Sequence, residues 1–170
     1  PFQIGNASLR VDVAYSTRPD FTNTGSGSAT ATTGTPAQPI SIDVKANGVP
    51  DPEFPGAFKA TATVAIPAAA TGSGSAILEG RPNVRIDTNR DGVLETVAVP
   101  VVASGKTFAI TDTTPVAYRE VVDIDKCNDC HKQLSLHGEN RSGNAELCAT
   151  CHNPNATDIN RRVAGSNCEA

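Results

Sequence analysis

The chain has 170 residues, a formal net charge of −4 and only 4% aromatic residues, with no Trp and no Met. This length suits one ordinary domain or two small ones, and the scarcity of aromatics means that Val, Ile, Leu and Ala must supply most of the core. The acidic balance argues against nucleic acid as a partner. No apolar run reaches the length of a membrane helix and no signal peptide opens the chain, so we expect no membrane span.

Residues 1–122 are predicted to form a β domain. Apolar and polar residues alternate there, as in strands with one buried face. The alternating segments lie around residues 9–15, 40–44, 58–66, 84–86, 97–101, 108–110 and 116–121. Short strands separated by Gly, Ser, Thr and Pro clusters are typical of a sandwich or small barrel. The longest such cluster, residues 22–39, has too little apolar surface to order itself, so we expect a mobile surface loop.

One loop of this domain has a pattern found in metal sites. In DTNRDG, Asp87, Asn89 and Asp91 occupy alternate positions and Gly92 follows, as in the first half of a calcium-binding loop. The twelfth position is Ala98, where a bidentate Glu is expected, and predicted strands flank the loop where an EF-hand has helices. A polar hairpin turn is therefore the favoured interpretation, and a calcium site is the alternative.

The last part of the chain contains the pattern C-x-x-C-H twice, as CNDCH at 127–131 and CATCH at 148–152. This pattern is the attachment site of a c-type haem, in which two thiols add to one haem and the histidine ligates its iron. Two haem c groups are therefore predicted, held by Cys127, Cys130 and His131 and by Cys148, Cys151 and His152. Because this attachment takes place outside the bacterial cytoplasm, the motifs also predict an exported protein.

Residues 123–170 are predicted to be the start of a haem domain, a small and mostly irregular segment with short helices. The helices are expected around 126–136 and 145–151, with a turn at 138–143. Few apolar residues are present, chiefly Leu134, Leu136 and Leu147. A segment so poor in core residues needs something else to fold around, and two porphyrins would serve.

Zinc is the rival interpretation of the same cysteines. Two C-x-x-C pairs separated by 17 residues fall within the spacing of a structural zinc site. The histidines favour haem, because two of the three in the chain directly follow a C-x-x-C pair. A four-thiolate zinc site or an iron–sulfur cluster has no use for them, whereas each haem needs one.

His137 is the third histidine and the only imidazole left to act as a sixth ligand; the alternative is a solvated loop histidine. Because the chain has no Met, a His/Met haem would need a ligand from another chain. The three histidines complete one bis-histidine iron. The other iron must find its sixth ligand elsewhere, accept a weak ligand or stay open, and spacing does not decide which haem His137 serves.

The motif segment resembles the OmcA/MtrC group of outer-membrane decahaem c-type cytochromes. The likeness is carried by KCNDCHKQLSLHGENR and LCATCHNPNATDINRR within residues 126–162, after a β-rich region that ends in VAYREVVDID. The resemblance implies haem c at both motifs, His137 as a distal ligand, and a Greek-key split barrel as the β domain. It also implies that this chain is the first β domain plus the opening of a haem domain, with the missing distal histidine in the continuation.

The resemblance implies electron transfer to metal oxides or other external acceptors, at the outer-membrane surface or outside the cell. The implied partners are other multihaem cytochromes, or further haems of a longer chain, and the extracellular acceptor. An iron with two imidazoles has no open position for a substrate, so we expect an electron-transfer protein and not an enzyme. The alternatives are a haem-based reductase with one open iron and a structural zinc module on a β domain.

Two further features remain open at this stage. Basic residues near the motifs could pair with haem propionates or simply be solvated; they are Lys126, Lys132, Arg141, Arg161 and Arg162. Cys168 is either a lone thiol or the first cysteine of a third motif.

Overall fold

The computed structural model describes residues 3–23 and 38–153. Most of the loop predicted at 22–39 therefore lies outside the described residues, as do Arg161, Arg162 and Cys168.

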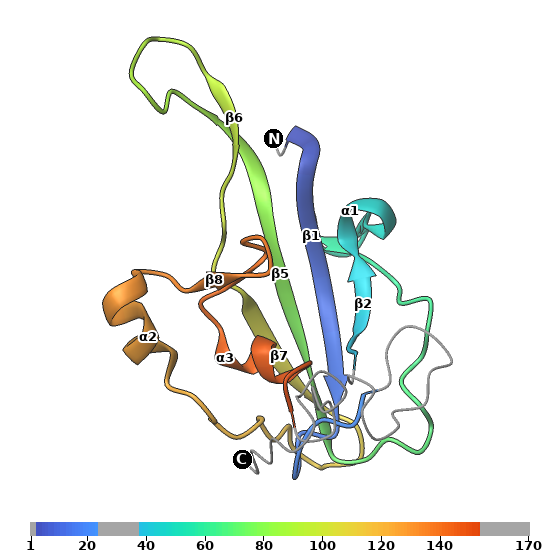
Figure 1. Ribbon diagram of the computed structural model, residues 1–170. Coiled ribbons are helices and arrows are strands. Elements are labelled where there is room, and N and C mark those ends of the chain that lie inside the picture. Colours follow the sequence, from blue (N-terminus) through green and yellow to red (C-terminus); the bar gives the residue numbers. More distant parts are fainter. Residues whose placement is uncertain (1–2, 24–37, 154–170) are drawn as a thin grey trace, which may run out of the picture.

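The described chain is organised on an antiparallel sheet of five strands (Figure 1), in the order β2-β1-β5-β6 with β7 also paired to β5. The strands are β1 (Gln3–Tyr15), β2 (Ile40–Asp43), β5 (Ser73–Ile86), β6 (Glu95–Ala98) and β7 (Ser104–Ala109). β7 pairs with the first half of the long strand β5, and β6 pairs with its second half. The short helix α1 (Val44–Asn47) and the small hairpin of β3 (Val49–Pro50) and β4 (Phe58–Lys59) follow β2 in the chain.

The prediction of a mainly β fold is confirmed, and the described sheet does not close into a barrel. Two predicted strands are wrong. Of residues 58–66, only Phe58–Lys59 is a strand, and residues 116–121 form none. At Val116 the backbone bonds to side chains and not to a neighbouring strand, since its N–H donates to Ser73 Oγ and its carbonyl accepts from Thr17 Oγ1.

The first eleven residues of β5 were not predicted, although this strand is the centre of the sheet. Its buried face consists of Ser73, Ser75, Ile77 and Glu79, so a strictly alternating pattern is present but most of its inward side chains are polar. Gly80 is required where β1 and β5 approach closely, because a Cβ there would lie 2.3 Å from the carbonyl oxygen of Ser8. Hydrophobic periodicity therefore misses this strand because most of its inward side chains are polar.

The predicted haem segment contains α2 (Ile124–His131), β8 (Ser135–Leu136), β9 (Arg141–Ser142) and α3 (Ala145–Ala149). Both expected helices are present, although α2 ends before the predicted residue 136. The turn expected at 138–143 joins β8 to β9, and its residues His137, Gly138 and Glu139 all have positive φ angles. The two C-x-x-C-H motifs therefore lie on or directly after two short helices.

The core consists of three small clusters, and two of them include residues of α3. Leu147 packs with Ile77 and Ala103. Ala149 packs with Ala14, Phe21 and Tyr118, where the two rings stack with centroids 4.3 Å apart. The third cluster is formed by Tyr15, Ile40 and Ala70. Residues on both sides of position 122 thus share one core.

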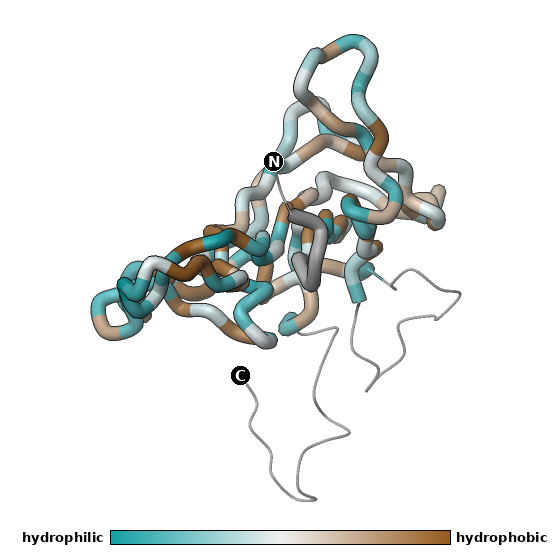
Figure 2. The backbone as a smooth tube through the Cα atoms, turned by 90° about the horizontal axis from the view of Figure 1, so that it is seen from above, coloured by the Kyte–Doolittle hydropathy of each residue, from teal (hydrophilic) through white to brown (hydrophobic). Residues whose placement is uncertain are grey.

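Hydrophobic stretches of the chain are short and alternate with hydrophilic ones (Figure 2). Among the described residues, no helix has the length and apolar character that crossing a membrane requires.

Candidate haem sites

The second motif begins on α3, which its own sequence caps. Asn144 is the N-cap residue, and its side-chain oxygen accepts a hydrogen bond of 2.9 Å from the Leu147 N–H, as capping asparagines do. After the helix, the His152 N–H donates to the Cys148 carbonyl at 2.8 Å. This bond extends the helical turn, so the first cysteine and the histidine of the motif lie on the same side, one turn apart.

Side chains of α3 fasten the second motif to the sheet. Leu147 is 1% exposed, and Thr150, within the motif, is fully buried. Asn23 follows β1 in the chain and donates a buried hydrogen bond of 3.0 Å to the Thr150 carbonyl. Asn144 also donates to the Ala103 carbonyl at 3.2 Å. The backbone around Cys148 and Cys151 is therefore fixed by packing and by buried hydrogen bonds.

The first motif occupies α2, and this helix has no buried residue. Its N-cap, Asp123, accepts from the Asp125 N–H at 3.1 Å and lies 3.6 Å from the exposed ammonium group of Lys126. Cys127 and His131 are one turn apart on this helix, so they share a face. In Figure 1, α2 lies at the edge of the molecule, whereas α3 lies over β5 and β7.

The rings of His137 and His152 lie near each other, with centroids 6.1 Å apart and ring planes inclined by 32°. Metal–imidazole bonds are about 2 Å long, so two imidazoles on opposite sides of one metal ion have centroids about 6 Å apart. Burial, then Arg141 and His152, lowers the pKa of His137, which favours the neutral form that ligates metals. The second motif, with His137 nearby, thus offers two thiols and two imidazoles, a donor set that fits a bis-histidine haem c.

The four paired cysteines, all of which the structure describes, do not fit a four-thiolate zinc site. Such a site needs its sulfurs around one ion, and no three of these thiols come within 4.8 Å of one another. Burial raises the pKa of Cys148 and of Cys151. The four thiols therefore do not converge on one point, although Cys127 lies near enough to Cys148 to raise its pKa further.

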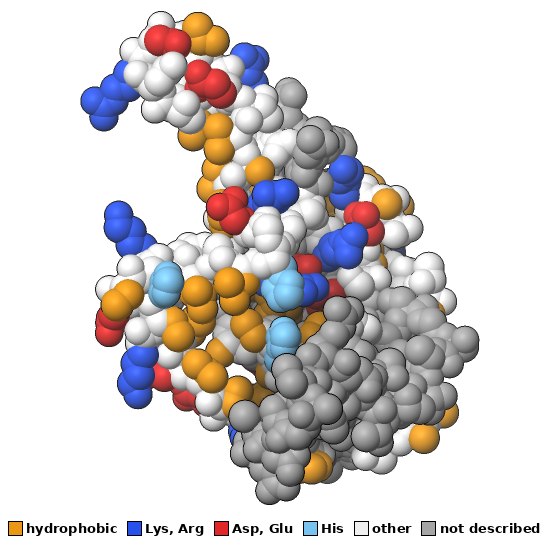
Figure 3. All heavy atoms as spheres, in the orientation of Figure 1, with side chains coloured by type: hydrophobic (Ala, Val, Ile, Leu, Met, Phe, Trp, Pro, Cys, Tyr) orange, Lys and Arg blue, Asp and Glu red, His pale blue; other side chains and the backbone are white. Residues whose placement is uncertain are grey.

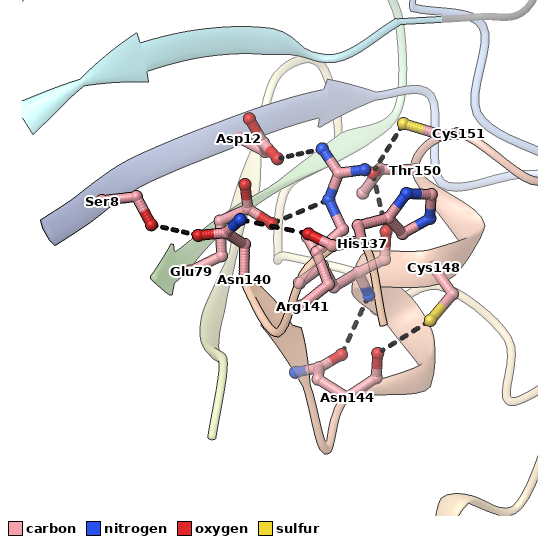
Figure 4. A network of polar contacts seen from close by, with 11 residues as sticks. Ser8, Asp12, Glu79, His137, Asn140, Arg141, Asn144, Cys148, Thr150 and Cys151 are labelled. Atoms are coloured by element: carbon pink, nitrogen blue, oxygen red, sulfur yellow. Dashed lines mark hydrogen bonds and ion pairs between the residues drawn. The ribbon is translucent and has the colours of Figure 1, made fainter. Parts of the chain in front are cut away.

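Arg141, on β9, lies between the sheet and the second motif (Figure 4). Its Nε donates to Glu79 at 2.8 Å, and its Nη2 lies 3.9 Å from Asp12. Both acids are buried, with Asp12 1% and Glu79 3% exposed. Burial raises the pKa of both carboxyl groups, against the opposing effect of Arg141, and the charge of Asp12 raises that of Glu79 further. Arg141, considered above for a propionate, is thus engaged by the β sheet.

An apolar surface lies among the histidines, where orange side chains gather in Figure 3. The large hydrophobic side chains that stay exposed around the haem segment are those of Val101, Val102, Val121, Val122 and Leu136. Val102 lies beside Gly143, whose substitution by a larger residue would bring a Cβ within 3.3 Å of Val102 Cγ1. A surface of this kind rarely faces water unless it binds something.

The calcium-type loop forms the turn between β5 and β6, which confirms the hairpin prediction. Asp87 and Asp91 lie close together, and Glu95, which the sequence interpretation missed, brings a third carboxylate within 4.8 Å of both. Asn89 is not part of this group and instead donates to Asp91 at 2.9 Å. The carboxylates also accept hydrogen bonds from the backbone of the same loop, because the Gly92 N–H donates to Asp87 and the Thr88 N–H donates to Glu95. Glu95 occupies the ninth position of the calcium-loop pattern that begins at Asp87, so checking that position in the sequence would have identified it.

A β scaffold that carries two C-x-x-C-H motifs, one with a second imidazole nearby, has the features of the c-type cytochrome class. Residues 119–169 match the family described as outer membrane cytochrome MtrC/MtrF-like, domains II/IV. This match supports the resemblance drawn from the motifs, for the haem segment of the chain. No curated protein and no solved structure matches the chain.

Proposed function

We propose that this protein transfers electrons through two covalently bound haem c groups, and that His137 and His152 are the axial ligands of the second. The observation that carries this proposal is the 6.1 Å separation of the two rings. When bound, a haem supplies a one-electron iron couple. The chain's part is to tether each group through two thiols and to hold the imidazoles in place.

The residues around the second motif favour a haem that is held in one position and whose iron has two histidine ligands. Its tether is anchored by Leu147 and Thr150, which are buried in the core. If His137 and His152 both held the iron of this haem, it would have no open position for a substrate. The first site differs, because His131 makes no ring contact with another histidine and all three histidines are described. Its second axial ligand must come from outside the described residues or be weak, so a reductase acting at that iron is the alternative function.

The exposed side chains of Val101, Val102, Val121, Val122 and Leu136 support the same proposal. A porphyrin is a large apolar ring, and covering these side chains removes hydrophobic area from water on both partners. Excluding water from the haem face is one of the means by which a protein sets its potential.

Location and partners follow from the family and not from the geometry. The matched family consists of outer-membrane cytochromes, so we place this protein at the outer-membrane surface or outside the cell. There it would exchange electrons with other multihaem cytochromes or further haems of a longer chain, and pass them to metal oxides or other external acceptors.

The direct test is His137→Ala in a chain produced with haem attachment. A pyridine haemochrome assay should give two haems per chain for both wild type and variant. Electron paramagnetic resonance should then show one more high-spin ferric iron per chain in His137→Ala than in wild type, because the second haem loses its sixth ligand. Glu139→Ala, in the same turn, is the control and should leave the spectrum unchanged.

A colourless protein that binds zinc would contradict the haem proposal as a whole. An unchanged low-spin spectrum in His137→Ala would contradict only the assignment of His137 to the second haem.

Calcium binding at the β5–β6 turn stays a prediction, now with Asp87, Asp91 and Glu95 as its carboxylates. Bound calcium would stabilise the folded state by mass action. The melting temperature should therefore fall on adding a chelator, and less so in Glu95→Gln. Equal melting curves with and without chelator would show that the loop is a hairpin turn alone.

A further inference from the structure

Two buried carboxylates share one guanidinium group beside the second motif. Asp12 lies on β1 and Glu79 on the neighbouring strand β5, and the side chain of Arg141 reaches both from β9. The side chains of Asp12 and Glu79 are only 2% and 4% exposed. With both acids ionised the cluster carries a net negative charge away from water, which is costly. Binding one proton would bring the net charge of these three side chains to zero.

Asp12 is the less satisfied of the two acids. Within the described part of the chain, its buried Oδ2 atom accepts no hydrogen bond, and the nearest guanidinium nitrogen is 3.9 Å away. Glu79, by contrast, accepts a direct bond of 2.8 Å from Arg141. Protonation is most favourable at a buried carboxylate oxygen that accepts no hydrogen bond, because nothing there stabilises the negative charge.

The cluster lies within electrostatic reach of the second motif. In Figure 4 the guanidinium group lies between the carboxylates on one side and Cys151 and the His137 ring on the other. The charges of Arg141, Asp12 and Glu79 all act on Cys151, and that of Arg141 acts on His137. The remaining neighbours are Arg10 on β1, which acts on both acids, and Ser41 on β2, which hydrogen-bonds to Asp12.

We propose that Asp12 and Glu79 form a proton-binding site coupled to the redox state of the second haem. The inference rests on the proposed function, since it needs a redox group at Cys148, Cys151 and His152. An electron added there makes the site more negative, so the acid pair binds a proton more tightly; oxidation releases that proton. One electron enters with up to one proton from solvent, and no other reactant is required. The β domain thereby takes part in electron transfer as well as holding the haem segment.

Proton uptake belongs to the pair and not to one acid, because two coupled carboxyls titrate together. Both pKa values are raised by burial, which shifts the coupling to higher pH than for solvated carboxyl groups. The second haem should therefore have a reduction potential that falls as the pH rises through that window.

The experiment uses the full haem-loaded chain carrying Cys127→Ala and Cys130→Ala, so that only the second haem is attached. Its reduction potential is measured by spectroelectrochemistry across the pH range. The parent should show a falling potential with a slope approaching one proton per electron. Asp12→Asn and Glu79→Gln should flatten this slope, whereas Glu53→Gln, at an exposed carboxyl, should leave it intact.

A second readout does not depend on the potential. Redox difference infrared spectra should show a protonated carboxyl band that gains intensity on reduction and is lost in Asp12→Asn. Thermal melting of each variant checks that the fold is kept, and Glu79→Gln provides an independent test if Asp12→Asn does not fold.

The outcomes separate the two proposals. A chain that incorporates no haem contradicts the proposed function. A haem-loaded parent whose potential does not change with pH contradicts the proton site alone. A pH-dependent potential that survives in both folded variants also overturns the site, since another group then binds the proton.

Discussion

The two C-x-x-C-H motifs are alike in sequence but held in different ways. The second motif follows α3, whose Leu147 and Ala149 belong to core clusters shared with the sheet. The first motif lies on α2, which has no buried side chain. The difference shows that the second motif is fastened to the β scaffold, whereas the backbone of the first motif depends on local capping.

The largest expected difference is between the ion pairs that lie beside each motif, measured by the loss of stability when each pair is broken. Replacing Arg141 by Met leaves Asp12 and Glu79 buried without compensation, which typically costs about 3 to 5 kcal/mol. Chemical denaturation at neutral pH should show this loss. Lys126→Met, which breaks the exposed pair with Asp123 on α2, should cost no more than about 1 kcal/mol. Equal losses would contradict the distinction between the motifs.

The loss in Arg141→Met should also depend on pH. The pKa values of Asp12 and Glu79 are already raised in the folded state, and removing Arg141 raises them further. A raised folded pKa means that stability is present below the unfolded pKa and is lost as pH rises through the folded one. The difference between variant and wild type should therefore shrink on acidification, as the carboxyl groups take up protons.

The core contact of α3 gives the next largest effect. Leu147 is 1% exposed, so Leu147→Ala should lower the free energy of unfolding by about 2 to 5 kcal/mol. The matched control is Leu136→Ala on β8, where the side chain is 51% exposed, and this change should have little effect on the haem-free chain. A Leu147→Ala variant as stable as the control would show that α3 is not anchored as described.

Removing the helix caps should give the smallest effects and still separate the motifs. Asn144→Ala removes the bond to the Leu147 N–H and should cost about 1 kcal/mol of global stability. Asp123→Ala removes the equivalent bond on α2 and should fray that helix only. Hydrogen exchange would distinguish them, since the first variant should speed exchange in core strands and the second in α2 alone. Faster core exchange in Asp123→Ala would mean that α2 is coupled to the sheet.

Sequence patterns identified the candidate site residues better than the strands that hold them in place. The two motifs, the mainly β character and both short helices follow from local signals, because C-x-x-C-H spacing and capping residues act within one turn of chain. The strand at 73–83 was missed since its inward positions include Ser73, Ser75 and Glu79. The segment at 116–121 alternates as a strand does, yet side chains and not a neighbouring strand bind its backbone at Val116.

The sequence by itself therefore determined the candidate haem-binding residues: four thiols and two histidines at the spacing that predicts two haem c groups, on a β-rich chain. Only the tertiary structure decided that His137 and His152 lie near each other, because the distance between residues 15 positions apart depends on the turn between β8 and β9. It also decided that Asp12, Glu79 and Arg141, from three distant parts of the chain, meet beside Cys151. Such contacts arise from how strands pair and helices pack, which local residue patterns do not encode.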